Sequence, residues 1–373
     1  MLWYFTNMEL KKFRYFNPVK IYFGDNIEKG IKEFIEIYGK NIIIVTGKKS
    51  QFENGNYQII SNILKRYNIN YTLWNKISPN ARYDEIDETI SLKGNYNSII
   101  ALGGGSVIDS AKCIGAVIRN HKDIRSLLNN GNFNNLPILA IPTTAGTGSS
   151  VTQYSVLMDK KNNDKRGFAH KTFFPKTAII SPNFTMSMPA KLTANTGLDA
   201  LTHLIESYLS TRANPISNLM ALKGIKLIKE NLLTAYRESE NGDARTNMAM
   251  ASLLGGLAIS QTGTILLHAL GYPLTVYYDI PHGLANAIML MPFIEFMEEI
   301  SVKRLHDILS ILSLPELKDI FNTLNIKTSL KEYNIGEDII DVFTNNVMDK
   351  KNLKYTPFEI NEKIVTNLYR KNL

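Results

Sequence analysis

Four residues in the second half of the chain have the side-chain types that bind transition metals. They are Asp199 and His203, which are four positions apart, and His268 and His282 further along. On a helix, residues four apart share one face and lie about 6 Å from each other along the axis. One carboxylate and three imidazoles match a complete ligand set for a divalent transition metal. The sequence therefore predicts a metal site whose ion would polarise the oxygen of a small substrate.

Each of the four residues also has an ordinary structural explanation when it is taken alone. A single buried His is more often a satisfied core residue than a ligand. Asp199 follows Gly197 near the start of a helical pattern, where a negative charge is favourable in its own right. Because four residues match one metal template together, the metal-binding interpretation is favoured.

A glycine run in the first half is suited to binding a nucleotide. Gly103-Gly104-Gly105-Ser106 follows a strand-like segment and opens a helical one. Glycines there let backbone N–H groups approach a pyrophosphate, whose charge the helix N-terminus favours. The alternative is a tight strand-to-helix turn with no ligand, and the run is not the ordinary G-x-G-x-x-G fingerprint.

A second loop strengthens the nucleotide interpretation. The run from Pro142 to Ser149 also follows a strand-like segment, and it contains Thr143, Thr144 and Thr147. Its hydroxyls and small residues suit contacts with phosphate, ribose or a nicotinamide amide, although such a cluster is often only a loop. Two loops of this kind at successive strand ends favour a dinucleotide site.

The elements that must position these loops alternate between strand and helix. Strand-like segments cover residues 41–46, 71–74, 98–102 and 136–141, and helical patterns cover 57–67, 83–93 and 107–119. This βαβα order predicts a doubly wound parallel sheet with a ligand crevice at the carboxyl ends of its strands.

The second half has a different pattern. Strand signals stop after about residue 187, and helical patterns cover 198–210, 216–231, 243–260, 282–299 and further segments towards the C-terminus. Two prolines frame a loop-like stretch at 182–189. We therefore expect an α/β dinucleotide-binding domain over 1–187 and an all-α, metal-binding domain over 188–373.

Composition excludes several classes of protein. The chain has 373 residues and a net charge of +8, but its basic residues are scattered, so we expect no nucleic-acid partner. The single Cys, Cys113, excludes an intramolecular disulfide. The apolar start, Met1–Phe5, is too short for a signal peptide. The sequence has no apolar run long enough to predict a membrane span. We expect a cytoplasmic location.

Taken together, these motifs resemble the iron-containing (group III) alcohol dehydrogenase family, with similarity to its 1,3-propanediol and butanol dehydrogenases. The match runs over nearly the whole chain. It begins at Asn17–Gly24, includes residues 103–112 and 142–149, and continues through 196–203 and the segments around His268 and His282. The occurrence of these motifs in this order is specific.

The resemblance implies an N-terminal dinucleotide-binding domain, a helical domain and an active site in the cleft between them, the dehydroquinate synthase-like fold. It implies Fe²⁺, with Zn²⁺ as the alternative, held by Asp199, His203, His268 and His282. Several further residues would face NAD(P) by the same resemblance: Asn80, Gly104, Gly105, Ser106, Asp109, Thr143, Thr144, Thr152 and Lys165.

Two departures from the family pattern affect the proton path and the threonine loop. Members often carry a second His four residues after the third ligand, proposed to relay protons, and here that position is Tyr272. Tyr272 can donate a hydrogen bond and is kept as a catalytic candidate, but its ordinary pKa makes it a poor base near neutrality. Ser150 stands where the family usually has Glu.

A third departure concerns the choice between NADP and NAD. Many members place an Asp after the first Val-Thr, where its carboxylate would hold the 2′-hydroxyl of NAD. This chain continues from Thr46 with Gly47, Lys48, Lys49 and Ser50. Without the carboxylate a 2′-phosphate is not repelled, and Gly47, Lys48 and Ser50 can bind it. We therefore expect NADP, with NAD as the alternative, unless both lysines are simply solvated.

These features predict a metal-dependent alcohol dehydrogenase or aldehyde reductase that moves a hydride between a small primary alcohol or diol and NADP(H). An NAD-linked, glycerol dehydrogenase-type polyol oxidoreductase is the alternative within the same fold. A non-catalytic nucleotide-binding protein on this fold is an alternative of a different class. The resemblance also implies a homodimer.

Overall fold

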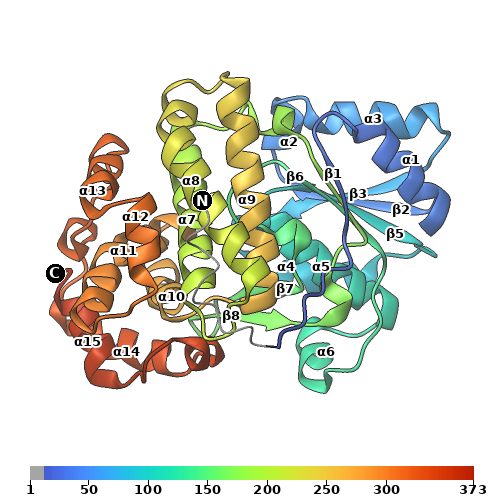
Figure 1. Ribbon diagram of the computed structural model, residues 1–373. Coiled ribbons are helices and arrows are strands. Elements are labelled where there is room, and N and C mark those ends of the chain that lie inside the picture. The colour runs from blue at the N-terminus through green and yellow to red at the C-terminus, as the bar shows by residue number, and fades with distance from the viewer. Residues whose placement is uncertain (1–11) are drawn as a thin grey trace.

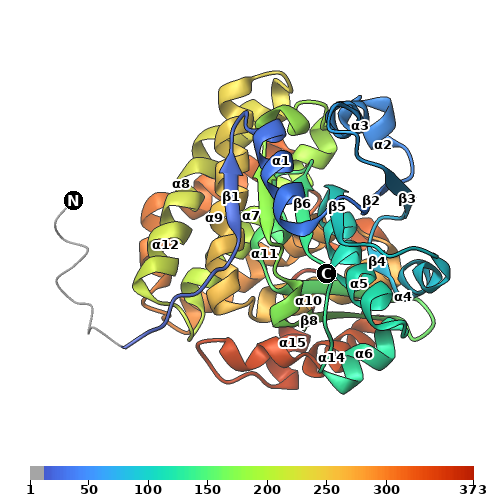
Figure 2. The same ribbon diagram turned by 90° about the vertical axis from the view of Figure 1, so that its right-hand side faces the viewer.

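The computed structural model describes residues 12–373, so the apolar start, Met1–Phe5, lies outside the described residues. A parallel six-stranded sheet forms the centre of the first half, with the strand order β1-β9-β6-β5-β2-β3. Figure 2 shows β1 along one edge of the sheet, on the side of α8 and α9. The strand bounds are Lys20–Phe23 for β1, Ile42–Gly47 for β2, Tyr71–Ile77 for β3, Ser98–Gly103 for β5, Ile138–Pro142 for β6 and Thr177–Ile180 for β9.

The central strands are buried on both faces because their side chains alternate between two apolar layers. Ile43 and Ile99 belong to the layer on one face, and Ile42 and Ile100 belong to the layer on the other. Helices α4 (Tyr83–Asp87), α5 (Gly105–Asn120) and α6 (Ile124–Asn130) pack on the first layer. Helices α1 (Ile27–Tyr38) and α3 (Asn56–Arg66) cover the second, and α2 (Ser50–Glu53) precedes α3. The expected doubly wound α/β architecture is therefore present (Figure 1).

A second sheet was not expected from the sequence. Its order is β4-β7-β8, formed by β4 (Ala81–Arg82), β7 (Tyr154–Asp159) and β8 (Asp164–Ala169), and β7 pairs with β8 as an antiparallel hairpin. Strand β8 begins with three charged residues and half of its residues are exposed, so it lacks the apolar run or alternation that predicts a strand. Pairing with β7 is what makes this segment a strand.

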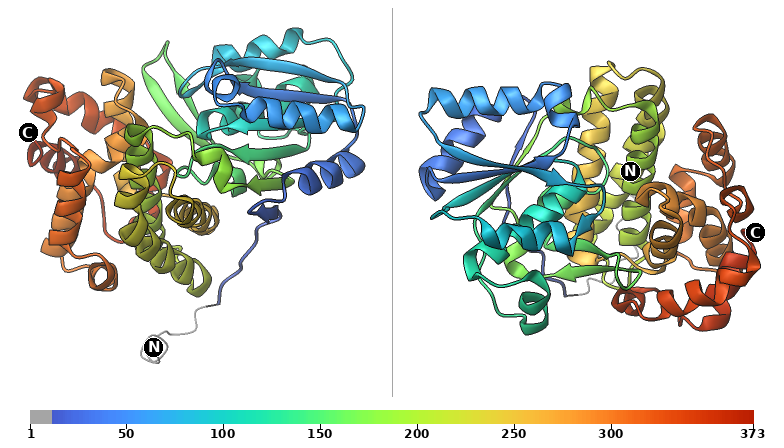
Figure 3. Two further views of the ribbon diagram at one scale, coloured as in Figure 1. Left: turned by 90° about the horizontal axis from the view of Figure 1, so that it is seen from above. Right: turned by 180° about the vertical axis from the view of Figure 1, so that it is seen from behind.

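The second half is helical, as predicted, and among the described residues no strand follows β9. Its apolar core is built by long helices packed side by side (Figure 3). Their bounds are Ala190–Leu209 for α7, Pro215–Arg237 for α8, Gly242–Thr262 for α9, Leu266–Tyr278 for α10, His282–Glu299 for α11, Leu305–Ile311 for α12, Leu314–Thr323 for α13, Ile340–Met348 for α14 and Glu362–Arg370 for α15. Short 3₁₀ helices cover Glu88–Ser91, Ser149–Val151, Lys171–Phe173, Pro182–Thr185, Leu330–Tyr333, Glu337–Ile339 and Lys351–Tyr355.

Many predicted element bounds differ from the structure by a few residues, and several differences are larger. Helix α7 begins at Ala190, well before the predicted residue 198, because the polar stretch in between is still helical. The helix predicted over 83–93 ends at Asp87 and continues as a 3₁₀ turn. The edge strands β1 and β9 were not predicted, since each is only four residues long.

The residue range 12–373 contains no single helix with the length and apolar character needed to span a membrane. Helices α9 and α10 pass that test only as a pair, and the pair is bent by 110° at its break.

Helix α7 is the element that brings the two halves of the predicted metal site together. It packs against α8, α9 and α11, and α10 packs against α11. The start of α11 lies so close to α7 that a Cβ atom at Gly283 would be 2.0 Å from the backbone oxygen of Asn195. Only glycine fits there, and its absence of a side chain lets His282 reach the level of Asp199.

Candidate functional site

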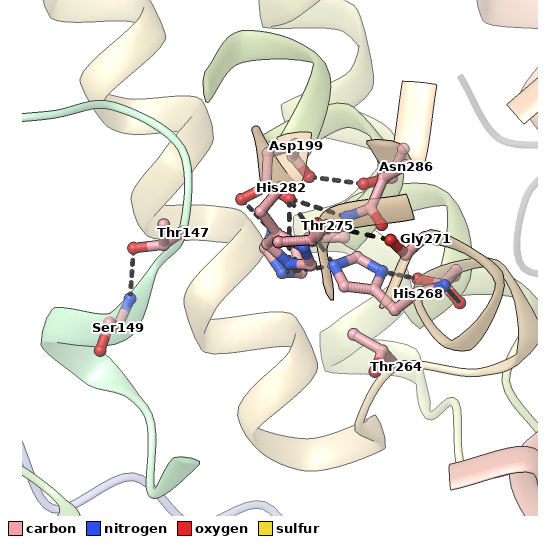
Figure 4. A network of polar contacts seen from close by, with 12 residues as sticks. Thr147, Ser149, Asp199, Thr264, His268, Gly271, Thr275, His282 and Asn286 are labelled. Atoms are coloured by element: carbon pink, nitrogen blue, oxygen red, sulfur yellow. Dashed lines mark hydrogen bonds and ion pairs between the residues drawn. The ribbon is translucent and has the colours of Figure 1, made fainter. Parts of the chain in front are cut away.

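The four predicted metal ligands come from three helices, and three of them, Asp199, His268 and His282, place their donor atoms within 4.8 Å of one another. Asp199 and His203 lie on α7, His268 lies on α10, and His282 is the first residue of α11. The Nε2 atoms of His268 and His203 are 3.0 Å apart. The Asp199 Oδ1 atom is 3.7 Å from His268 Nε2 and 3.8 Å from His282 Nε2. Figure 4 shows the side chains of Asp199, His268 and His282 pointing toward one another.

The donors of Asp199, His268 and His282 are close enough to share a single transition-metal ion, and His203 adjoins this group through His268. Four donors about 2.1 Å from one ion at tetrahedral angles lie roughly 3.4 Å from each other. The measured separations of 3.0, 3.7 and 3.8 Å are close to that value. Two imidazole nitrogens that face each other at 3.0 Å also need a cation or a proton between their lone pairs. The donor set, one carboxylate and three imidazoles, suits both iron and zinc.

A buried carboxylate that the sequence analysis did not single out supports His268. Glu206 is fully buried, and its Oε2 contacts His268 Nδ1. Its Oε1 accepts the backbone N–H groups of Ile265 at 2.9 Å and His268 at 3.2 Å. A carboxylate on Nδ1 fixes the imidazole so that Nε2 presents its lone pair. The signal was available, because residues 199, 203 and 206 share one face of a helix.

Asn286 holds the carboxylate of the set. Its Nδ2 atom donates to Asp199 Oδ1 at 3.0 Å and lies 3.5 Å from His282 Nε2. Because Asn286 follows His282 by four positions on α11, one helix supplies both an imidazole and the group that orients the carboxylate. This amide was not predicted as a site residue either.

Burial adjusts the protonation of the imidazoles. It lowers the pKa of His203 to about 4. Burial, together with the Lys165 charge, holds the pKa of His282 well below its ordinary value. Burial also opposes protonation of His268, but the Glu206 carboxylate raises the pKa of His268 above its ordinary value overall. The lowered pKa values of His203 and His282 favour neutral imidazoles, which keep the lone pairs that a metal requires.

The glycine loop lies at the carboxyl end of β5 and opens α5, as predicted. Gly105 is in contact with the threonine loop, and a Cβ atom there would be 2.5 Å from the Thr147 methyl group. The Thr143 backbone N–H donates to the oxygen of Gly103 at 3.1 Å. The two loops therefore form one surface at the carboxyl edge of the sheet, where the nitrogens of the first α5 turn are available to a phosphate.

Two charged residues, the partly buried Asp109 and the fully buried Lys112, hold the threonine loop in place. Asp109 accepts the Ser149 hydroxyl and, at 2.9 Å, the Val156 N–H. Lys112, which is fully buried, donates to Ser149 Oγ at 2.9 Å and lies 3.4 Å from Thr152 Oγ1. Asp109 and Thr152 thus lie beside the threonine loop, and their side-chain atoms already bond to the chain. In this structure they order the loop.

The residues expected at a 2′-phosphate lie at the end of β2, apart from the metal site. Gly47 ends the strand, and Ser50 begins α2. Lys48 donates to the Ser78 hydroxyl at 2.8 Å and lies 3.8 Å from the Glu85 carboxylate. Glu85 was not predicted here, and its charge partly offsets that of Lys48.

Lys165 links the nucleotide loops to the metal site. Its side chain is 3% exposed, and its Nζ atom donates to Asn80 Oδ1 at 3.1 Å. The Asn80 backbone N–H donates to Ser106 Oγ at 3.0 Å, at the start of α5. On its other side, Lys165 Nζ lies 5.7 Å from the centre of the Tyr272 ring, which is stacked on His282. A ligand held by the glycine loop would meet the metal site beside this amine.

The remaining predicted residues lie in the threonine loop or beside the metal ligands. Thr143 Oγ1 accepts from Gln51 at 3.0 Å, and Thr144 packs against Gly104. Tyr272 is buried, which raises its pKa above the ordinary value, so its hydroxyl loses its proton less readily than that of an exposed tyrosine. Ser150, which replaces the usual Glu, is buried in the 3₁₀ turn Ser149–Val151.

The sequence of the chain is similar to the sequences of known proteins. Residues 18–182 match the family described as iron-containing alcohol dehydrogenase, and residues 193–373 match the C-terminal part of the Fe-containing alcohol dehydrogenase family. The chain is 34% identical over 289 residues to a 1,3-propanediol dehydrogenase of Citrobacter freundii, covering 76% of this chain and 75% of that protein. It is 31% identical over 349 residues to an NADPH-dependent butanol dehydrogenase of Clostridium saccharobutylicum, covering 87% of each.

The fold agrees with a solved structure. An iron-containing alcohol dehydrogenase from Thermotoga maritima superposes with a TM-score of 0.90 at 32% identity, over 97% of this chain and 99% of that one. The family matches cover both halves, and the donor cluster and the nucleotide loops lie within the matched ranges. The chain belongs to the iron-containing alcohol dehydrogenase family.

Proposed function

We propose that this protein is a metal-dependent enzyme that interconverts small primary alcohols or diols and their aldehydes with NADP(H). The observation that carries the proposal is the convergence of Asp199, His203, His268 and His282 beside Lys165, which also contacts the nucleotide side of the cleft. An ion there, when bound, supplies positive charge that polarises the alcohol or aldehyde oxygen. The chain itself orients the reactants and excludes water.

The residues around the cleft have separable roles in this proposal. The glycine and threonine loops bind the cofactor phosphates, and Asn80 with Lys165 places the cofactor end nearest the metal ligands. Glu206 and Asn286 orient His268 and Asp199. The Tyr272 ring lies between Lys165 and His282 and forms part of the cleft wall.

For the cofactor we favour NADP over NAD. Lys48 and Ser50 follow β2, where an acidic residue would repel a 2′-phosphate, and Lys48 remains exposed. Glu85 opposes this choice, because it lies 3.8 Å from Lys48 and repels an added anion. Lys48 directly follows the last residue of β2, and this position favours NADP. The similar butanol dehydrogenase is itself named as NADPH-dependent.

Nitrogen and oxygen ligands suit both Fe²⁺ and Zn²⁺. We favour Fe²⁺ because the family that the chain matches is iron-containing. We also propose a domain boundary near residue 187, between β9 and α7, so that the cleft separates an α/β domain from a helical one. We also propose that the protein forms a homodimer and is located in the cytoplasm.

One experiment tests the function directly. The protein is stripped with a chelator, reloaded with Fe²⁺ or Zn²⁺, and given a panel of aldehydes, including butanal and 3-hydroxypropanal, with NADPH or NADH. We expect turnover only after metal reloading, with NADPH preferred. Full activity of the stripped protein would contradict the metal requirement. Activity confined to glycerol with NAD would favour the polyol alternative, and no turnover with any pair would favour a non-catalytic protein.

A further inference from the structure

A segment near the C-terminus, Asp349–Tyr355, touches elements on both sides of the cleft. It follows α14 and contains the 3₁₀ turn Lys351–Tyr355. Figure 1 shows α14 at the lower edge of the molecule, with the chain that follows it reaching toward β8. None of its residues was predicted to belong to the site.

On one side the segment is paired with β8 through two ion pairs. Lys350 Nζ lies 2.7 Å from Asp164 Oδ1, and Lys350 is only 7% exposed. Asp349 pairs with Arg166, two positions further along the strand. A largely buried pair such as Lys350–Asp164 is far more costly to break by removing one partner than an exposed one.

These pairs bracket the residue that enters the cleft. Alternate side chains of a strand point to opposite faces, so Asp164 and Arg166 share one face and Lys165 points to the other. Their partners agree with this, because Lys165 contacts Asn80 and lies over Tyr272. Fixing residues 164 and 166 from outside therefore fixes the direction of Lys165 inside.

On its other side the segment holds the turn that leads into α10. Asn352 Nδ2 donates to the backbone oxygen of Ile265 at 2.7 Å and lies 3.4 Å from Thr264 Oγ1. The Ile265 N–H donates in turn to Glu206, the carboxylate that contacts His268. Two hydrogen bonds thus separate Asn352 from the carboxylate that orients a candidate metal ligand.

The end of the segment is anchored to the helical half. The Thr211 backbone N–H donates to the oxygen of Tyr355 at 2.9 Å. The Arg212 guanidinium lies 4.8 Å from the centre of the Tyr355 ring. Because Tyr355 is held by the residues that follow α7, the segment cannot compensate for a shift of Lys350 by moving away from that helix.

We propose that Asp349–Tyr355 acts as a bracket that sets the spacing between the strand carrying Lys165 and the turn leading into His268, with Lys350 as its main positioning residue. The inference rests on the proposed function, because the spacing matters where a cofactor on one side must transfer a hydride to a substrate on the other. The bracket touches neither reactant. It acts through Lys165 and through Glu206.

The test compares Lys350→Met with the conservative variant Lys350→Arg and with Lys351→Met, which changes the exposed neighbouring lysine. Hydrogen–deuterium exchange is followed in β8 and in residues 263–268. Turnover of butanal is measured with NADPH and with NADPH carrying deuterium at C4. We expect Lys350→Met to raise exchange in both segments and to lower turnover by about tenfold to a hundredfold, since a displacement near 1 Å can cost that much.

The isotope ratio separates positioning from mere loss of folded enzyme. If Lys350→Met misaligns the reactants, hydride transfer becomes slower and the ratio of the two turnover rates rises, whereas partial unfolding lowers both rates and leaves their ratio unchanged. Lys350→Arg should restore the wild-type ratio, and Lys351→Met should keep it. Unchanged exchange in β8, or an unchanged isotope ratio, overturns the proposal. If wild-type protein turns over no substrate, the proposed function fails, and exchange in the two segments alone decides whether the bracket exists.

Discussion

The amine of Lys165 lies over the ring of Tyr272, 5.7 Å from its centre, and both residues are buried. The same ring is stacked on His282. A cation, an aromatic ring and a candidate metal ligand thus form one row from the nucleotide side to the metal side. A positive charge over a ring is stabilised when it is desolvated, but burial still disfavours it relative to water.

The buried amine should make folding stability depend on alkaline pH. Burial lowers the pKa of Lys165 to about 8, while the charges of Asp199 and Asp109 oppose that shift. Between pH 8 and the ordinary value of 10.5, the unfolded chain binds more protons at this residue than the folded chain does. Stability therefore rises with pH through that window, by roughly 3 kcal/mol if the whole shift is realised. Urea unfolding of wild type and Lys165→Met at pH 7.5 and 10 measures the difference, and equal pH dependence in both proteins would contradict it.

The carboxylate behind His268 should control metal affinity. Replacing Glu206 by Gln removes the negative charge next to Nδ1 while nearly preserving volume. We expect the dissociation constant for Zn²⁺ or Fe²⁺ to rise by about tenfold to a hundredfold, the usual effect of losing such a partner. Competition with a metal-binding dye measures it. Glu230→Gln, on the exposed face of α8, is the matched control and should bind metal like the wild type.

Tyr272 should not supply the proton path. Burial raises the pKa of Tyr272 above its ordinary value, so the hydroxyl stays protonated across the working range of pH. We expect Tyr272→Phe to keep the wild-type pH–rate profile and to change kcat/KM by less than about tenfold, the loss of one hydrogen bond at most. A limb of the profile that disappears in Tyr272→Phe would show that the hydroxyl titrates in turnover.

Lys48 should distinguish the two cofactors. Its amine is exposed and lies 2.8 Å from the Ser78 hydroxyl, at the place proposed for a 2′-phosphate. We expect Lys48→Ala to raise the KM for NADPH by about tenfold, the lower range for a charge-assisted contact, and to leave that for NADH nearly unchanged. Lys49→Ala serves as the control. A parallel loss with both cofactors would place Lys48 away from the 2′ position.

The close approach of α11 to α7 should tolerate no side chain. A Cβ atom at Gly283 would lie 2.0 Å from the Asn195 backbone oxygen and 2.9 Å from the Cβ of Asp199. Gly283→Ala must therefore push the helices apart, which costs about 1–3 kcal/mol in a packed core and displaces His282. Thermal unfolding and metal titration together measure this. Gly242→Ala, where nothing lies within 4 Å, is the control and should be neutral in both.

The sequence by itself determined the features that depend on local pattern. The apolar runs at 42–45 and 99–102 predicted buried strands, and the helical periods from residue 198 onward predicted a helical half. The types and spacing of Asp199, His203, His268 and His282 selected a metal-ligand set, because few other arrangements use those residues together. The glycine and threonine loops were also identified from local pattern, because their residue types suit phosphate binding and each loop follows a predicted strand.

Only the tertiary structure decided how distant segments support these residues. The contact of Glu206 with His268 joins positions 62 residues apart, and the pairing of Lys350 with Asp164 joins positions 186 residues apart. Strand β8 has no strand pattern of its own and forms through pairing with β7. Local periodicity reports which face of an element is buried, but the partner that covers it is chosen by the packing of the whole chain, where long-range contacts offset the loss of chain entropy.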